Sequence, residues 1–264
     1  MKNLDISSRQ SLEGKLGIIR DRVRSVVNRS TRGFFLYGPG GIGKTFAVSN
    51  LLNELKVKWT SCNSHITGAG LYEYMRTNQD SVIVIDDAEH LLEDKKALGY
   101  LRSATYGQNG QCVVTRTTNE AREEFLFSGG IIILSNKSMG TSDPLKALAT
   151  RMSPAEFVLP ETEKRTLMRM IANKGVSGLT PRICKQVLAF IEVNQKLMNG
   201  KPLDIRFFEN CLSDRFLYEK GKVESNWMDL IASRMCGKIL LPQMPKNPNF
   251  RGAAQKPQRL SKGH

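Results

Sequence analysis

Residues 38–45 read GPGGIGKT, which matches the P-loop pattern G-x-x-x-x-G-K-[ST] at every fixed position. An apolar run at 33–37 precedes the pattern and a helix-compatible run at 46–55 follows it. The pattern therefore lies between a predicted strand and the amino end of a predicted helix. Glycines there let backbone N–H groups face phosphate oxygens, and the helix end adds partial positive charge. A glycine-rich turn of another kind would leave the lysine and threonine unexplained.

In this position Lys44 would reach the β- and γ-phosphates of a nucleotide, and the hydroxyl of Thr45 would contact Mg²⁺. The sequence therefore predicts a nucleotide-binding site. Its predicted residues are Gly38, Pro39, Gly40, Gly41, Ile42, Gly43, Lys44, Thr45 and Phe46.

A second apolar run, at 81–87, ends in two carboxylates, Asp86 and Asp87. A carboxylate at the end of a buried strand can hold Mg²⁺ through its water shell, so Asp86 and Thr45 are the predicted metal residues. Asp87 could orient and polarise an attacking water as the general base. Two adjacent aspartates alone would be a weak signal, but a P-loop followed by an apolar strand ending in Asp is a strong pair.

Three more residues occupy informative places. Asn136 ends the apolar run 130–136, where its amide could contact the γ-phosphate and the attacking water. Arg151 lies shortly before the last predicted strand, and Arg206 lies in a predicted helix further along the chain. A lone arginine is most often a surface charge, so these two arginines gain meaning only from their order along the chain.

In that order the features resemble the AAA+ ATPases. The resemblance implies ATP with Mg²⁺, and it implies that Asn136 is the first sensor residue. It also implies that Arg151 is an arginine finger supplied by a neighbouring subunit, and that Arg206 is the second sensor residue in a helical lid. The likeness covers residues 12–236 and is similar in pattern to AAA+ ATPases encoded by phages and plasmids.

One position departs from the family pattern. In AAA+ ATPases the aspartate that ends this strand, called the Walker B aspartate, corresponds to Asp86. The family usually carries glutamate after it, whereas this chain has Asp87, which is one methylene shorter. The shorter side chain could sit farther from the attacking water. Hydrolysis could then be slow, or Glu89 could take part instead.

Strand-like runs alternate with helical runs as far as residue 160, which predicts a parallel sheet with right-handed crossovers. The predicted fold is α/β: a P-loop parallel sheet flanked by helices, with a small C-terminal all-helical lid domain. The predicted strands are 33–37, 57–61, 81–87, 111–118 (a strand or a hairpin arm), 130–136 and 156–159. The predicted helices are 12–28, 46–55, 71–77, 93–105, 143–149, 161–173, 180–194, 203–218 and 225–235.

Four segments follow from this pattern. Residues 1–32 are an N-terminal basic helical segment, 33–160 the P-loop α/β domain and 161–236 the helical lid. Residues 237–264 carry six basic residues, four prolines and no acidic residue, so we expect a largely disordered tail.

The formal net charge is +14, from 39 Lys and Arg against 25 Asp and Glu. Such an excess favours a nucleic-acid partner, although solubility alone is the plainer explanation. Five dispersed cysteines without a C-x-x-C pair indicate free thiols in the cytoplasm. No apolar run is long enough for a membrane span, and the first residues lack a signal-like segment, so we expect neither membrane insertion nor secretion.

The sequence thus predicts an ATPase that hydrolyses ATP at the subunit interfaces of a homo-oligomer to remodel or load a DNA-associated partner. One alternative is a protein-remodelling ATPase with an aromatic pore loop, for which Tyr72 and Tyr74 are the available aromatics, although both fall in a predicted helix. Another alternative is a nucleotide-dependent scaffold with little hydrolysis. The remodelled substrate and the ring size stay open.

Overall fold

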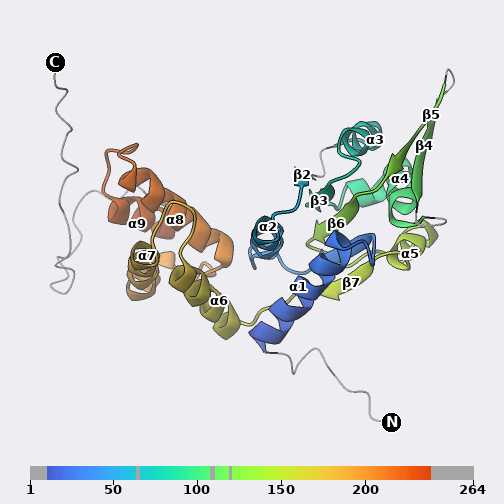
Figure 1. Ribbon diagram of the computed structural model, residues 1–264. Coiled ribbons are helices and arrows are strands. Elements are labelled where there is room, and N and C mark those ends of the chain that lie inside the picture. Colours follow the sequence, from blue (N-terminus) through green and yellow to red (C-terminus); the bar gives the residue numbers. More distant parts are fainter. Residues whose placement is uncertain (1–10, 64–65, 108–110, 119–120, 239–264) are drawn as a thin grey trace, which may run out of the picture. The chain divides into compact units, whose positions relative to one another are not determined.

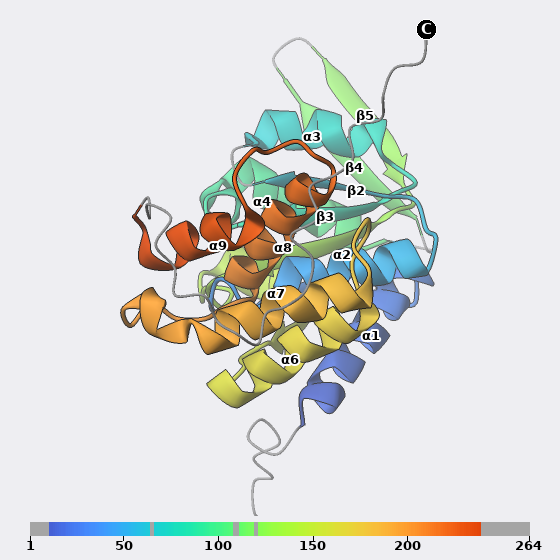
Figure 2. The ribbon, with the colours of Figure 1, turned by 90° about the vertical axis from the view of Figure 1, so that its left-hand side faces the viewer.

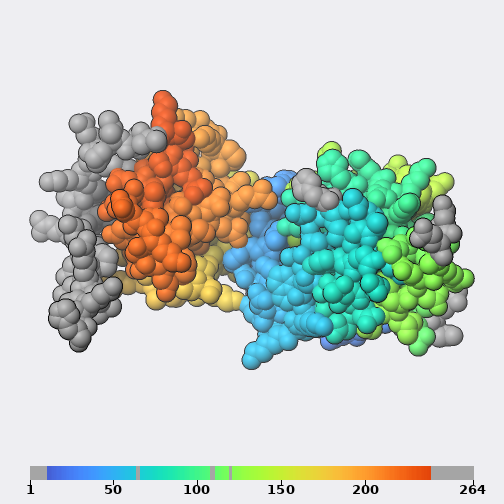
Figure 3. Space-filling view, turned by 90° about the horizontal axis from the view of Figure 1, so that it is seen from above, coloured from blue at the N-terminus to red at the C-terminus, as the bar shows by residue number. Residues whose placement is uncertain are grey.

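The computed structural model describes residues 11–63, 66–107, 111–118 and 121–238 (Figure 1). The chain divides into two compact units, Met1–Pro160 and Glu161–His264. Figure 3 distinguishes them by colour, blue through yellow-green for the first and yellow through red for the second. Residues 1–10 and all but the first two residues of the predicted basic tail lie outside the described residues.

The first unit contains a five-stranded parallel sheet in the order β2-β3-β6-β1-β7. Its inner strands are apolar up to their last residue, because both faces of the sheet are covered and the side chains before that residue are buried whichever way they point. The strands are β1 (Gly33–Tyr37), β2 (Trp59–Asn63), β3 (Val82–Asp86), β6 (Gly130–Ser135) and β7 (Ser153–Glu156).

Helices cover both faces of this sheet (Figure 1). One face is covered by the short 3₁₀ helix η1 (Leu91–Glu93) together with α3 (Gly68–Thr77), α4 (Lys95–Thr105) and α5 (Asp143–Ala149). On the other face α1 (Leu12–Val27) packs on α2 (Lys44–Glu54) and contacts β1 and β6. The predicted α/β fold, a parallel sheet flanked by helices and followed by C-terminal helices, is confirmed.

Alternate residues of each strand supply the two cores. On the α3–α4–α5 face the fully buried strand residues are Phe35, Ile83, Ile85, Ile131 and Ile133. Their neighbours in sequence are buried as well. They include Phe34, Leu36, Ile132 and Leu134. This two-sided burial holds the strand ends in fixed positions, and the polar residues that follow the strands depend on it.

A hairpin projects beyond the sheet (Figure 1). It consists of β4 (Cys112–Thr117) and β5 (Arg122–Phe127), which form a separate antiparallel pair. The sequence predicted a strand or hairpin arm at 111–118 but no strand at 122–127. The second strand was missed because its REEFLF sequence is charged on both faces near the turn, so the period-2 alternation of a half-buried strand is lost.

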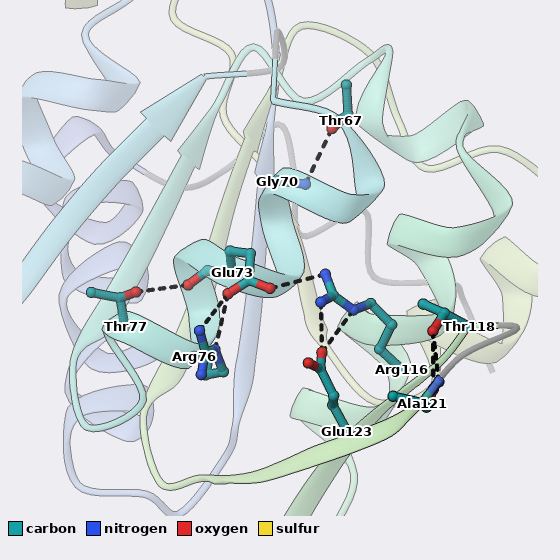
Figure 4. Close-up of polar contacts among 9 residues, drawn as sticks. All are labelled: Thr67, Gly70, Glu73, Arg76, Thr77, Arg116, Thr118, Ala121 and Glu123. Atoms are coloured by element: carbon teal, nitrogen blue, oxygen red, sulfur yellow. Dashed lines mark hydrogen bonds and ion pairs between the residues drawn. The ribbon is translucent and has the colours of Figure 1, made fainter.

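Arg116 attaches this hairpin to α3 (Figure 4). Its guanidinium pairs with Glu73 of α3 at 2.9 Å and with Glu123 of the facing strand. It also lies 4.5 Å from the ring centre of Tyr72, which is fully buried. That ring contacts Tyr100 and Phe125 in turn. Arg116 and its two glutamate partners therefore pack on buried aromatic rings, and the hairpin is fixed to the α3–α4 face.

Two strands differ from the prediction by a few residues. Strand β2 begins at Trp59 instead of 57 because Lys56 has a left-handed φ of 52° and the N–H of Val57 returns to the carbonyl of Leu52, which completes the end of α2. The last strand is Ser153–Glu156 instead of 156–159. It tolerates Pro154 because it lies at the sheet edge and pairs only with β1.

The second unit is helical in its described residues. Helices α6 and α7 lie side by side, and α8 packs on both α7 and α9 (Figures 1 and 2). Its core includes a T-shaped pair of rings, Phe190 and Trp227, whose centres lie 5.3 Å apart, and the guanidinium of Arg215 stacks 4.3 Å from the Trp227 ring centre. The elements are α6 (Glu161–Lys174), α7 (Pro181–Val193), η2 (Gln195–Met198), α8 (Ile205–Glu219) and α9 (Trp227–Cys236).

None of the helices in the described residues is both long enough and apolar enough to cross a lipid bilayer.

One carboxylate fixes the start of two helices. Asp94 precedes α4 and accepts hydrogen bonds from the N–H groups of Lys96 (2.7 Å) and Ala97 (3.2 Å). Its other oxygen accepts the N–H of Gly68, the first residue of α3, at 2.9 Å. Burial alone would raise the pKa of Asp94, but these backbone hydrogen bonds outweigh burial and lower the pKa.

We predict that Asp94→Ala lowers the free energy of unfolding by about 2 kcal/mol, because it leaves N–H groups of both helix ends without their acceptor. Asp94→Asn should cost less. Since the folded-state pKa is lowered, the carboxylate stabilises the protein fully above the ordinary carboxyl pKa, and this stabilisation is lost as the pH falls through the folded-state pKa. Urea denaturation at neutral and acidic pH should show wild type and Asp94→Asn converging in acid. A constant difference would contradict this assignment.

Candidate functional site

The predicted phosphate loop, the two aspartates and Asn136 lie at the carboxyl ends of three adjacent strands of the sheet. Strand β6 lies between β1 and β3 and pairs in parallel with both. The loop after β1 is the predicted phosphate loop, and the chain after β3 carries the two aspartates. Asn136 directly follows β6, so it lies between the other two groups. Ligands of open α/β sheets bind in the crevice outside such carboxyl ends.

The phosphate loop has the backbone that only glycine adopts easily. A Cβ atom on Gly38 would lie 2.0 Å from the carbonyl oxygen of Phe157, so no other residue fits there. Gly43 has a left-handed φ of 87° and precedes Lys44, the first residue of α2. No side chain of the described residues caps this helix end. The first N–H groups of this helix can therefore face an anion.

The remaining loop residues lie as the motif requires. Gly41 also has a left-handed φ, of 76°, and Pro39 and Gly40 are exposed. Ile42 is buried beneath the loop and Phe46, in the first turn of α2, is half-buried. The loop thus combines an exposed backbone with an apolar anchor on its inner side.

Lys44 is the most buried charged residue of the site, with 7% of its surface exposed. Its ammonium donates to the carbonyl oxygens of Gly38 (2.6 Å) and Pro39 (2.9 Å) and to Oδ1 of Asn136 (3.1 Å). A buried ammonium needs such partners, because its desolvation is otherwise uncompensated. The cation therefore lies at the centre of the loop, in reach of an anion held there.

Thr45 and Asp86 form the second contact of the site. The Thr45 hydroxyl donates to Oδ2 of Asp86 at 2.8 Å, and Oδ1 of Asp86 accepts the N–H of Asp87 at 3.0 Å. A hydroxyl and a carboxylate are the oxygen ligands that Mg²⁺ prefers. The described residues contain no cluster of three or more metal-ligating side chains. These two groups therefore fit a Mg²⁺ ion that also takes ligands from phosphate and water.

Asn136 connects the other two groups. Its Oδ1 accepts from Lys44, and its Nδ2 donates to Oδ1 of Asp87 at 3.2 Å. A Cβ on Gly40 would lie 3.6 Å from the same Oδ1 atom, which places the amide against the loop. Asp87 itself is exposed and has a left-handed φ of 51°, which is uncommon for a residue other than glycine.

Arg151 lies near the amino ends of the strands, at the opposite end of the sheet from Lys44. It follows α5 and precedes β7, whose first residue pairs with Phe34 near the start of β1. Its guanidinium stacks 4.9 Å from the ring centre of Tyr106, which follows α4 and is 58% exposed. The phosphate loop begins at the other end of β1, about 15 Å away at the usual rise per residue. Arg151 therefore does not join the Lys44 group of its own chain.

Arg206 belongs to the second unit. It is exposed in the first turn of α8. Burial raises the pKa of nearby Glu209, and the positive charge of Arg206 opposes that rise.

An open pocket of about 610 Å³ lies beside the Thr45–Asp86 pair. Residues along β2 and Tyr74 of α3 form part of its wall, and burial raises the pKa of Cys62 in this wall to about 11. Its lining residues are Thr45, Ser49, Trp59, Ser61, Cys62, Asn63, Ile66, Tyr74, Val84 and Asp86.

The sequence did not single out three residues of this region. Asn63 pairs with Asp86 across β2 and β3, and the two-residue shift of β2 places it at the strand end. The hydroxyl of Ser135 lies 2.8 Å from the carbonyl oxygen of Lys137, and Tyr106 stacks on Arg151. A polar residue ending a strand would have indicated the first, but local sequence carries no signal for the stacking partner of an arginine.

Comparison with known proteins agrees with this geometry. Residues 34–123 match the family "ATPase family associated with various cellular activities (AAA)". This stretch of the α/β unit is therefore similar to the AAA family. The match includes the phosphate loop and both aspartates, and it ends inside β5, before Asn136, Arg151 and Arg206.

A phage protein is also similar to this chain. It is the "Uncharacterized 36.7 kDa protein in nrdC-mobD intergenic region" of Enterobacteria phage T4, 29% identical over 123 residues. The similarity covers 42% of this chain and 38% of the phage protein, so it spans well under half of that relative. The family match supports the predicted resemblance to AAA+ ATPases, and the phage protein fits its phage-like pattern.

We predict that Asp86→Asn weakens the Mg²⁺-dependent part of ATP binding by roughly 10- to 100-fold. The reason is that Thr45 and Asp86 would orient the ligands of the metal ion, and only Asp86 of the two is charged. Titration of a fluorescent ATP analogue at varied Mg²⁺ measures this effect. Asp80→Asn is the control, since Asp80 is an exposed carboxylate just before β3 that pairs with Lys58. An equal response of the two variants would contradict the metal assignment.

Proposed function

We propose that this protein binds Mg²⁺-ATP and hydrolyses it at the subunit interfaces of a homo-oligomer. The observation that carries the proposal is the group Lys44, Asn136 and Asp87, joined by hydrogen bonds of 3.1 and 3.2 Å at the edge where Thr45 meets Asp86. The match of residues 34–123 to the AAA family supports ATP as the nucleotide, since that family is described as one of ATPases.

Each group has a part in this reaction. Lys44 and the N–H groups at the start of α2 would bind and neutralise phosphate oxygens. Thr45 and Asp86 would hold Mg²⁺, which neutralises developing negative charge when it is bound. Asp87 would accept a proton from the attacking water. Asn136, which already donates to Oδ1 of Asp87, would orient that water and sense the γ-phosphate.

The shorter carboxylate at position 87 has a supporting context. The left-handed backbone of Asp87 turns its side chain out of the strand direction, and Nδ2 of Asn136 holds one of its oxygens. Its exposure leaves the other side open to a water molecule. We therefore propose Asp87 as the base.

The position of Arg151 supports a shared site. An arginine at the amino edge of the sheet cannot serve its own phosphate loop, but it can serve that of a neighbouring copy. Such an arginine would stabilise negative charge that develops during phosphoryl transfer. A head-to-tail contact of this kind generates rings or helical filaments, so we propose a homo-oligomer.

The second unit would act as the lid on the nucleotide, with Arg206 as its sensor arginine. Residues 1–32, 33–160, 161–236 and 237–264 remain the proposed functional divisions. The net charge of +14 supports nucleic acid as the partner whose binding changes with hydrolysis, in a replication, loading or transposition role. The five free cysteines suit a cytoplasmic location.

The protein-remodelling alternative finds less support. Tyr72 is fully buried under Arg116, and the hydroxyl of Tyr74 donates to the carbonyl of Ser61 at 2.8 Å. Both rings are therefore engaged within the fold, so neither serves as an aromatic that grips a polypeptide. A scaffold with little hydrolysis differs from our proposal only in turnover, which an ATPase assay decides.

We predict that equimolar Lys44→Ala and Arg151→Ala subunits, each inactive alone, regain about a quarter of wild-type ATP turnover when mixed, because random assembly makes about one interface in four complete. A mixture of Lys44→Ala and Asp86→Asn is the control and should stay inactive, since both residues serve the same half of the site. An inactive first mixture would refute the shared site.

We also predict that DNA stimulates turnover by the full chain and that binding to labelled DNA weakens at least about tenfold between 50 and 200 mM salt, as expected for several phosphate contacts. Anisotropy and ATPase assays with single-stranded and duplex DNA test this expectation. Stimulation by an unfolded protein instead of DNA would favour the remodelling alternative, and ATP binding without any turnover would favour the scaffold.

A further inference from the structure

We infer that Glu89 is a positioning residue. Its carboxylate holds the backbone N–H of Asn136, and this contact aligns the Asn136 side chain between Lys44 and Asp87. This inference rests on the proposed function, because it assigns Asn136 a part in hydrolysis. It differs from the expectation that Glu89 could replace Asp87 as the base.

The geometry places Glu89 against the end of β6. Its Oε1 atom accepts the N–H of Asn136 at 2.6 Å. The same atom lies 3.1 Å from the hydroxyl of Ser135, which is 2% exposed and can donate its hydrogen either to Glu89 or to the carbonyl of Lys137 at 2.8 Å. A short N–H bond to a carboxylate is stronger than a bond between neutral groups.

The backbone brings Glu89 to this place. The left-handed turn at Asp87 is followed by a hydrogen bond from the N–H of Ala88 to the carbonyl of Leu134, at 3.2 Å. The chain after β3 therefore stays beside β6 for two more residues. The carbonyl of Ser135 accepts the N–H of Gly38 at 3.2 Å, so the end of β6 is joined to the phosphate loop as well.

A carboxylate beside a phosphate site is unfavourable unless its charge has a structural use. Burial would raise the pKa of Glu89, but the N–H of Asn136, its own N–H, the Ser135 hydroxyl and the charge of Lys44 outweigh burial and lower the pKa. The group is therefore ionised and already occupied as an acceptor, which makes it a weak base. Its negative charge also helps to balance the buried ammonium of Lys44.

Two side-chain exchanges separate the two roles. In Glu89→Gln the amide oxygen can still accept the N–H of Asn136, whereas in Glu89→Ala nothing accepts it. A positioning residue should therefore tolerate Gln better than Ala, while a base should fail equally with both, because an amide cannot take up the proton. Glu93, an exposed carboxylate of η1, provides the matched control substitutions Glu93→Gln and Glu93→Ala.

The experiment measures ATP turnover, binding of a fluorescent ATP analogue, thermal unfolding and hydrogen exchange of the Asn136 amide in the nucleotide-free protein. We expect Glu89→Ala to lower kcat by about 10- to 100-fold, the effect of losing a charge-assisted hydrogen bond, with KM changed by less than about threefold. Glu89→Gln should retain most of the wild-type kcat. Amide exchange at Asn136 should be fastest in Glu89→Ala and intermediate in Glu89→Gln.

Several results would overturn the inference. Equal losses of kcat in Glu89→Gln and Glu89→Ala would make Glu89 the base, and unchanged turnover or unchanged exchange in Glu89→Ala would remove its part in holding Asn136. If Glu89→Ala unfolds at a lower temperature, the exchange difference between wild type and Glu89→Gln still decides. Failure of the proposed function is distinguishable, because wild type and the Glu93 variants would then show no turnover, while the exchange pattern would be unaffected.

Discussion

The buried ammonium of Lys44 is the interaction on which the geometry of the site depends. A cation with so little exposure needs oxygen partners, and it takes them from the phosphate-loop backbone and from Asn136. The loop is thereby folded around the lysine, and the amide that follows β6 is drawn against the loop that follows β1. A bound phosphate would find the loop, the cation and the amide already arranged, so little ordering would accompany binding.

The parallel sheet sets a second constraint. All five strands run in the same direction, so their carboxyl ends gather at one edge and their amino ends at the other. Lys44, Asp86 and Asn136 share the first edge, and Arg151 is held against Tyr106 at the second. Arg151 is therefore separated from the phosphate loop of its own chain by about the length of β1. Our proposal of a site shared between subunits follows from that separation.

Several elements could be predicted because their signals are local. The GPGGIGKT motif, the apolar strands and the polar residues at the strand ends each occupy a few consecutive positions, and two-sided burial makes the inner strands apolar up to their last residue. Strand β5 and the exact place of β7 could not be predicted. Charged residues interrupt the alternation of the first, and only pairing with β1 decides which residues of the segment around Pro154 form the second.

The amino-acid sequence by itself determined the α/β class and named the candidate residues for contact with a nucleotide, because glycine, lysine and carboxylate chemistry is fixed by residue type and spacing. The tertiary structure decided which of these residues meet. It joined Asn136 to both Lys44 and Asp87, set Glu89 behind Asn136 and stacked Arg151 on Tyr106. These contacts link residues up to 92 positions apart, and strand order, which no local pattern encodes, brings them together.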